Sequence, residues 1–379
     1  MRKTVTTVAV GGVLAALALT ACSSGSSDSS SSSGGATSAA ASGGSSSSSG
    51  TLDGKGTKVG IILPDTQSSQ RWVNGDPQAL ADGCKAANLD CDIQNANGDA
   101  AKMKSIAQSM ESNGIKILMI VNLDNASGAA IEQEAASKGI TTIDYDRLTL
   151  GGNAALYISF DNTKVGEQQG TALTQCAQVQ GQSAVKYVDV NGSPTDSNAA
   201  LFKTGYDSVL SKAPGWTKVA DQSIDKWDNT TAGTTFASML QANPDILAVM
   251  VANDGMANSV ISQLTNQGLN GKVAVSGQDA TAQGLQHILA GDQCFTIEKP
   301  YKLEADAAIK AMVQIANGQK PETTTTAKDS QTGNDVPAVL ETPTTITKAN
   351  VKQVVDDGVV SKEELCTGSF AALCTQAGI

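Results

Sequence analysis

From Lys58 onward, short apolar runs alternate with longer segments in which apolar residues recur at helical spacing. The first run, Val59–Leu63, is continuously apolar, as is typical of a parallel strand buried on both faces of a sheet. The other strands expected before Asp161 are Cys91–Gln94, Ile115–Val121, Ile140–Tyr145 and Ala155–Phe160, and the helices are Gln78–Ala87, Ala101–Ser112 and Ala126–Lys138.

The same alternation restarts after Asp161. The expected strands there are Ala184–Val190, Lys218–Ile224, Ile246–Val251, Val273–Ser276 and Cys294–Ile297, and the helices are Lys164–Val179, Ser197–Lys212, Thr231–Gln241, Met256–Gln267, Ala282–Ala290 and Lys302–Ala316. The remainder predicts a strand near Val339–Leu340 and a short helix, Val351–Asp356. Two such series predict an α/β fold with two doubly wound parallel-sheet lobes. We expect Phe160–Asn162 to cross between the lobes and Arg147 to lie in the cleft.

The N-terminal residues carry an export pattern. Arg2 and Lys3 precede an apolar run, Val8–Leu19, that is too short for a comfortable membrane span. The run leads to Ala21-Cys22, a small residue before a cysteine, as in bacterial lipoprotein signals. We therefore expect residues 1–21 to be a signal peptide and Cys22 to be lipidated. The alternative is a plain secretory signal with a chance cysteine.

A tether is expected to follow, because Ser23–Gly50 consists almost entirely of Ser, Gly and Ala. Residues 22–57 would then join the lipid to the folded part. The sequence predicts an exported protein that is anchored by lipid to the outer face of the cytoplasmic membrane.

Six cysteines remain after Cys22, an even number that suggests disulfides in an exported protein. Cys84 and Cys91 bracket a helix end and the next strand, and Cys366 and Cys374 close a small loop. The pair left over is Cys176 and Cys294. Fifteen pairings are possible, and free, buried thiols remain the alternative for this last pair.

Composition excludes several classes of function. A formal net charge of −11 argues against nonspecific binding to nucleic acid. A single histidine, His287, excludes a histidine-rich metal site and argues against Ser-His or Cys-His catalysis. No phosphate-binding glycine loop follows a strand, and no EF-hand loop is present in the sequence. We expect no cofactor and no bound metal.

Polar residues gather where the expected strands end. Ligands bind beyond the carboxyl ends of parallel strands, so these residues are candidates for a site. They are Asp65, Arg71, Trp72, Asn122, Asp124, Asp146 and Arg147 in the first series, and Asp196, Asn198, Trp227, Asn253, Asp254, Gln278, Asp279 and Lys299 in the second.

This mixture of side chains suits a sugar. Each hydroxyl taken from water needs new partners, because an unsatisfied buried polar group costs about 1–3 kcal/mol. Carboxylates and amides accept hydrogen bonds, Arg and Lys donate them, and a tryptophan ring suits the C–H face of a pyranose. Mixed charges fit a neutral polyol better than an anion.

From about Lys58 to Asp357 the chain resembles the bacterial periplasmic sugar-binding proteins of the type 1 fold, and most closely their xylose-binding branch. The motifs that carry the resemblance are Gln70-Arg71-Trp72, Tyr145-Asp146-Arg147, Tyr157–Asn162 with Lys164–Glu167, Gly192–Pro194 with Asp196 and Asn198-Ala199, Ala252–Asp254, Gly277–Ala280 and Lys299-Pro300. The loop Asp65–Ser69 is similar instead to a branch that accepts glucose, galactose and arabinose.

The resemblance implies a monomeric receptor that delivers an aldose, D-xylose first, to the membrane subunits of an ABC importer. It implies three hinge crossings, near Phe160–Asn162, near Lys299–Tyr301 and in the Thr-rich segment after Lys320. The N-terminal lobe is then 58–160 plus 301–327, and the C-terminal lobe is 161–300 plus 328–379. The implied sugar contacts are Arg71, Trp72, Arg147, Asp196, Asn198, Trp227, Asn253, Asp279 and Lys299.

Two other functions are consistent with parts of the pattern. A secreted carbohydrate enzyme could pair Asp196 with Asp279 as acid and nucleophile, although nothing in the sequence marks either role. A lactose-repressor-like regulator would share the fold, but it needs an N-terminal DNA-binding helix pair where this chain has an export signal and tether.

Overall fold

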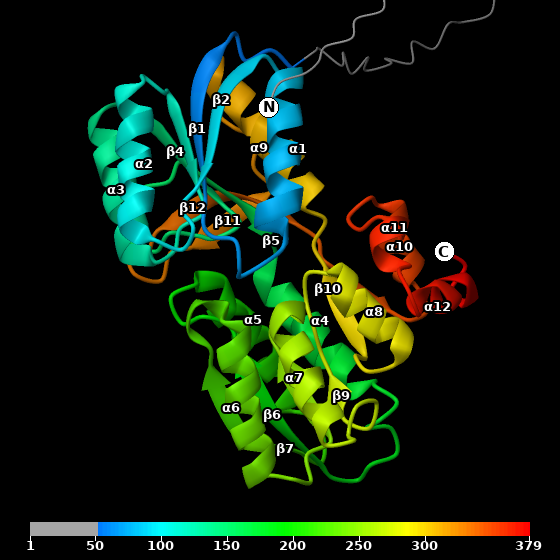
Figure 1. Ribbon diagram of the computed structural model, residues 1–379. Helices are drawn as coiled ribbons and strands as arrows, with labels where there is room; N and C mark the ends of the chain where they lie inside the picture. The colour runs from blue at the N-terminus through cyan, green and yellow to red at the C-terminus, as the bar shows by residue number, and fades with distance from the viewer. Residues whose placement is uncertain (1–51) are drawn as a thin grey trace, which may run out of the picture. The chain divides into compact units, whose positions relative to one another are not determined.

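The structure is a computed structural model that describes residues 52–379. The predicted signal peptide, Cys22 and the tether up to residue 51 lie outside the described residues. The described chain forms two α/β lobes, and Figure 1 shows them one above the other, with the last three helices beside α8. This confirms the predicted fold class.

The N-terminal lobe is built on a seven-stranded sheet with the order β11-β12-β5-β4-β3-β1-β2, parallel except for β11. Its strands are β1 (Thr57–Leu63), β2 (Leu89–Asn95), β3 (Ile117–Ile120), β4 (Thr141–Tyr145), β5 (Leu156–Phe160), β11 (Thr325–Lys328) and β12 (Asp335–Glu341). Successive side chains of a strand point to opposite faces. Ile61 therefore packs in the core under α1 and α9, whereas Ile62 packs in the core under α2 and α3.

The helices cover both faces of this sheet. They are a π-helical turn, η1 (Arg71–Gly75), then α1 (Asp76–Ala86), α2 (Ala100–Ser112), α3 (Asn125–Ser137) and α9 (Tyr301–Ala316). Asp99 and Asp124 cap α2 and α3 by accepting backbone N–H groups, so each helix begins where a polar residue follows a strand.

The C-terminal lobe has a four-stranded parallel sheet in the order β7-β6-β8-β9 and a separate antiparallel pair, β10-β13. Its strands are β6 (Val185–Asn191), β7 (Trp216–Ser223), β8 (Ala248–Val251), β9 (Ala274–Val275), β10 (Phe295–Glu298) and β13 (Thr344–Thr347). Its helices are α4 (Asn162–Thr174), α5 (Ser197–Leu210), η2 (Asp225–Trp227), α6 (Asn229–Ala242), α7 (Asp254–Asn266) and α8 (Ala282–Ala290). A Cβ on Gly166 would lie 2.0 Å from the Phe202 carbonyl oxygen, so this glycine lets α4 and α5 pack closely.

Three segments cross between the lobes. Two lie where they were expected, between β5 and α4 at Asp161 and between β10 and α9 at Lys299-Pro300. The third lies later than predicted, because β11 and β12 both belong to the seven-stranded sheet and the chain crosses at Thr342-Pro343. The prediction that residues 328–341 belong to the C-terminal lobe is therefore wrong. The strand near Val339 pairs in parallel with β5, and this long-range pairing cannot be predicted from the Thr-rich sequence.

The last three helices are α10 (Val351–Asp356), α11 (Lys362–Leu365) and α12 (Phe370–Gln376). Their apolar residues, including Val354 and Leu365, share a small core with Leu285 and Ile288 of α8. The expected disulfides Cys84–Cys91, Cys176–Cys294 and Cys366–Cys374 are all present. Within residues 52–379, no helix has the length and apolar character needed to span a membrane.

Candidate functional site

A cavity lies where the carboxyl ends of both sheets face each other. All nine predicted site residues line it. Its lining consists of Ser68, Ser69, Arg71, Trp72, Asp146, Arg147, Asp196, Asn198, Phe202, Trp227, Asn253, Gln278, Asp279 and Lys299. The strand-end argument therefore brought together residues that are more than 200 positions apart in the chain.

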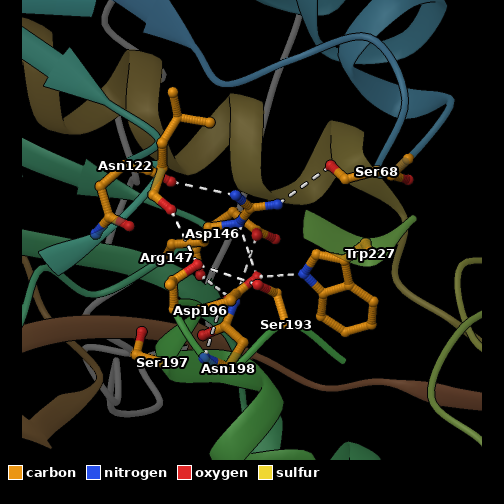
Figure 2. Close-up of polar contacts among 12 residues, drawn as sticks. Ser68, Asn122, Asp146, Arg147, Ser193, Asp196, Ser197, Asn198 and Trp227 are labelled. Atoms are coloured by element: carbon orange, nitrogen blue, oxygen red, sulfur yellow. Dashed lines mark hydrogen bonds and ion pairs between the residues drawn. The ribbon is translucent and has the colours of Figure 1, made fainter. Parts of the chain in front are cut away.

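Arg147 joins the two lobes. Its Nε lies 2.9 Å from an Asp196 carboxylate oxygen, and its terminal nitrogens donate to the Asn122 carbonyl (3.1 Å) and the Ser68 hydroxyl (3.3 Å). Figure 2 shows Asp196 between the Arg147 guanidinium and the Trp227 indole, whose N–H donates to it at 3.1 Å. The ion pair therefore connects the end of β4 in one lobe to the start of α5 in the other.

Asn198 lies at the hinge side of the cavity. Its amide donates to the Asp146 carbonyl (2.8 Å), and its side-chain oxygen accepts from Tyr157 (3.1 Å) and Asn162 (2.9 Å). Tyr157 and Asn162 flank the first crossing. This side chain thus joins the cavity to a hinge segment.

Arg71 is enclosed by carboxylates of its own lobe. It donates to both oxygens of Asp76 (2.8 and 2.6 Å), to Asp146 (2.9 Å) and to Glu304. Four bonds occupy most of the five N–H groups of a guanidinium. Tyr145 completes the cluster by donating its hydroxyl to Asp76 (2.6 Å). Arg71 lines the cavity, but its charge is balanced from within the N-terminal lobe.

Asp76 does not act as the N-cap of α1. Asp76 is the first residue of α1, and its fully buried side chain bonds Arg71 and Tyr145 instead of the helix backbone. The preceding turn, η1, closes with the Asp76 N–H bonded to the Arg71 carbonyl. Pro77 has no N–H to continue an ordinary helical ladder, and wide turns of this kind are frequent at functional sites.

The other charged groups of the cavity also bridge the lobes. Lys299 Nζ lies 3.6 Å from an Asp279 oxygen and 4.0 Å from Asp146. Asp279 accepts from the Ser69 hydroxyl at 3.2 Å, and Asn253 donates to the Ser68 carbonyl at 3.1 Å. The loop Asp65–Ser69 therefore touches the C-terminal lobe through two of its residues.

The aromatic side chains have specific partners. The Arg71 guanidinium carbon lies 4.4 Å from the centre of the Trp72 ring, a cation–π arrangement. The Trp227 ring lies against the Gly192 backbone, where a Cβ would come within 2.1 Å of it, and meets Phe202 edge-on. Neither indole is free to rearrange without disturbing the cavity wall.

Burial and neighbouring charge set the protonation of these groups. Burial acts to raise the pKa of Asp146, but Lys299, Arg71 and Arg147 outweigh it and hold the pKa below its usual value. Burial raises the pKa of Asp196 despite Arg147. Burial also raises the pKa of Glu304 to about 8, although Arg71 opposes the shift.

Three residues at the cavity have side chains although their backbone conformations favour glycine. Asp146 (φ 61°), Trp227 (φ 56°) and Asp279 (φ 93°) all lie in or near the left-handed region. Such residues cost about 1–3 kcal/mol each, persist only where the surrounding structure enforces them, and cluster at functional sites. Three such residues around one cavity indicate that the surrounding structure holds the backbone in conformations that these residues disfavour.

Polar atoms of the cavity remain without hydrogen-bond partners among the described residues. They are the Trp72 indole nitrogen and the Gln278 side-chain oxygen. This donor and this acceptor, both buried, are groups that a polar, uncharged ligand could satisfy. In this arrangement the side chains meet across the cavity and leave only about 30 Å³. A polar ligand would enter by exchanging these interlobe bonds for bonds to its own polar groups.

Five lining residues were not among the predicted contacts. Asp146 and Gln278 were among the polar residues expected at strand ends, but they were not among the implied sugar contacts. Ser68 and Ser69 follow Asp65, whose carboxylate accepts the N–H groups of Gln67 and Ser68 in a tight turn. The polar turn after the first strand was therefore the sequence feature that could have predicted Ser68 and Ser69 as lining residues. Phe202 lies inside α5 and had none, because it looks like any core residue.

Among residues 52–379 no group of three potential ligands could hold a metal ion. The carboxylates of the cavity instead face arginine and lysine. The cavity thus offers balanced charge and uncharged hydrogen-bonding groups.

Comparison with known proteins agrees with this geometry. A family profile described as "Periplasmic binding protein domain" matches residues 59–320. The D-xylose-binding periplasmic protein of Escherichia coli is 35% identical over 316 residues, which cover 82% of this chain and 93% of that protein. The protein of the same name from Haemophilus influenzae is 32% identical, with 84% and 94% covered.

The solved structures agree. An ABC transporter solute-binding protein from Clostridium phytofermentans, crystallised with β-D-glucose, superposes with a TM-score of 0.74 at 26% identity. The match covers 82% of this chain and 100% of that one. The resemblance noted in the sequence is thereby confirmed: the chain belongs to the periplasmic binding protein family, among its sugar-binding members and closest to the xylose branch.

Proposed function

We propose that this protein captures a monosaccharide, D-xylose first, between its two lobes and delivers it to the membrane subunits of an ABC importer. The observation that carries the proposal is the cavity itself, in which buried donors and acceptors from both lobes face one another without a net excess of either charge. The two xylose-binding relatives support this choice of sugar, and the glucose-bound structure makes glucose the second candidate.

The mechanism follows from the bonds that join the lobes. Arg147–Asp196, Ser69–Asp279 and Asn253–Ser68 all span the cleft. A sugar that bridges these residues binds the closed arrangement and not the open one, so it shifts the population toward closure. The three crossings are the segments about which the lobes would move.

The same residues argue for a receptor and not for a hydrolase. Asp196 is bonded to Arg147, Trp227 and the Asn198 backbone, and Asp279 to Ser69 and Gln278 with Lys299 nearby. A hydrolase needs one carboxyl poised as an acid and another as a base or nucleophile. Release of sugar from a xyloside by the purified protein would argue for the enzyme.

We further propose a monomer that is anchored through lipid on Cys22. The anchor rests on the sequence motif Ala21-Cys22. Incorporation of radiolabelled palmitate by cells, lost in Cys22→Ala, is the expected result. Equal labelling of both would remove the anchor from the proposal without affecting the site.

Calorimetric titration tests the sugar. The purified protein is titrated with D-xylose, glucose, galactose, arabinose and ribose. We expect one-to-one binding of xylose, weakened at least about 100-fold in Asp279→Ala, because the charged partner of Lys299 is lost. Tight binding of another sugar would change the assigned specificity to that sugar. Absence of binding to all five sugars would contradict the proposed receptor function. Lys320→Ala, outside both the cavity and the hinge crossings, serves as the control variant.

A further inference from the structure

A second, larger depression adjoins the cavity. It is a groove of about 540 Å³ that shares Ser68, Ser69, Arg71, Asn253, Asp279 and Lys299 with the cavity lining. Two interlobe bonds, Ser69–Asp279 and Asn253–Ser68, join residues that line both spaces. A group attached to a sugar in the cavity could therefore pass between these residues into the groove.

The chemistry of the groove is neutral and rich in amides. Beyond the shared residues it is lined by six carboxamide side chains, Gln67, Gln70, Asn74, Asn229, Asn258 and Gln283. The single charged residue of this outer lining is Glu364, which accepts from the N–H and hydroxyl of Ser361 in a helix cap. No outer cation is present to pair with a phosphate or carboxylate, so the groove suits an uncharged, hydroxyl-rich ligand.

Two features give the groove a means of holding a ring. The side-chain oxygens of Asn229 and Asn258 are buried and lack hydrogen-bond partners among residues 52–379. Tyr301 also lines the groove, where its half-buried ring packs against Gly75, since a Cβ there would lie 2.8 Å from the ring. Hydrogen-bond acceptors and a flat aromatic ring in the lining of one groove are typical of sugar subsites.

The groove is formed by four segments that the fold brings together. They are the loop and turn before α1, the ends of α6, α7 and α8 that face the cleft, the second crossing, and Gly358–Glu364 before and within α11. Figure 1 shows α11 beside α8. Both lobes contribute, so a ligand in the groove would favour closure as a ligand in the cavity does.

We infer that the groove is a subsite for a second sugar ring, so that the receptor binds a short neutral oligosaccharide as well as a monosaccharide. This rests on the proposed function, because the first ring occupies the cavity. It adds a substrate class that the cavity alone does not predict.

Xylobiose is the probe, because either of its rings can enter the cavity. Two or more added hydrogen bonds in the groove are expected to make xylobiose bind about fivefold to tenfold tighter than xylose. Asn74→Trp fills the groove with a large ring and is expected to weaken xylobiose at least about tenfold, with xylose within about twofold. Val73→Trp is the matched control, since Val73 is exposed in the same turn and lies outside the groove lining.

The outcomes separate the two proposals. Xylose binding without xylobiose binding overturns the subsite and leaves the receptor intact. An equal effect of Asn74→Trp and Val73→Trp on xylobiose also overturns it. If neither xylose nor xylobiose binds, the titrations are repeated with glucose, cellobiose and maltose. Binding of glucose without either disaccharide overturns the subsite. Binding of none of these sugars contradicts the proposed function itself.

Discussion

The two arginines of the cavity contrast in where their partners lie. Arg71 is held by Asp76, Asp146 and Glu304, which all belong to the N-terminal lobe. Arg147 is paired with Asp196, which belongs to the C-terminal lobe. Both side chains line the same cavity, and both are nearly buried.

Because of this difference, we expect Arg71 to affect folding and Arg147 to affect closure of the lobes. The partners of Arg71 stay together when the lobes part, so its ion pairs contribute to the stability of one lobe. The partner of Arg147 moves away with the other lobe, and both charges can then be hydrated. We therefore expect the first cluster to support the fold and the second to control ligand capture.

The largest expected effect is on folding. Arg71→Met leaves Asp76 and Glu304 buried without their ion-pair partner and removes one of the two cations beside Asp146, which should lower the free energy of unfolding by about 3–5 kcal/mol. Urea unfolding monitored by circular dichroism measures this change. A loss below about 1 kcal/mol would show that the carboxylate cluster does not need its arginine.

Arg147→Met provides the matched comparison. We expect at least about a 100-fold weaker affinity for the bound monosaccharide, equivalent to about 2.7 kcal/mol. The free energy of unfolding should change by less than about 1 kcal/mol, because Asp196 can reach water in the open form. X-ray scattering should also show less compaction on addition of sugar. A large loss of stability with intact binding would reverse the roles assigned to the two arginines.

Glu298 extends the comparison to a buried carboxyl that forms no ion pair within residues 52–379. It is fully buried at the second crossing, and neither oxygen has a hydrogen-bond partner in the described part of the chain. Burial, reinforced by Asp357, raises its pKa to about 7. The folded state thus keeps a proton that the unfolded state releases near its ordinary pKa, so this stabilisation is present below about pH 4.5 and is lost as pH rises through 7.

Glu298→Gln removes this titration. Relative to the unmodified protein, the variant should gain about 2 kcal/mol of unfolding free energy between pH 5 and pH 8. Urea unfolding at both pH values measures the gain, with Glu363→Gln on the exposed face of α11 as the control. A difference between variant and unmodified protein that is the same at both pH values would contradict the assignment.

Much of the architecture could be predicted from local pattern. Val59–Leu63 and Thr231–Gln241 lie within β1 and α6 because apolar spacing is a property of neighbouring residues. The cavity residues were also predictable, since polar residues that end parallel strands meet at one edge of a sheet. The three disulfides agree with the expected pairs, two of them between cysteines seven and eight residues apart.

Tertiary structure decided how these residues are paired. The carboxylates that bind Arg71 are 5, 75 and 233 positions away, and no spacing rule links them. The positive φ angles of Trp227 and Asp279, and the strand β12 that moved the third crossing, likewise depend on long-range packing. Sequence alone determined which elements form and which chemistry stands at their ends, because both follow from local periodicity. Only the folded chain decided which charges balance within a lobe and which across the cleft, because ion pairing depends on distances in space.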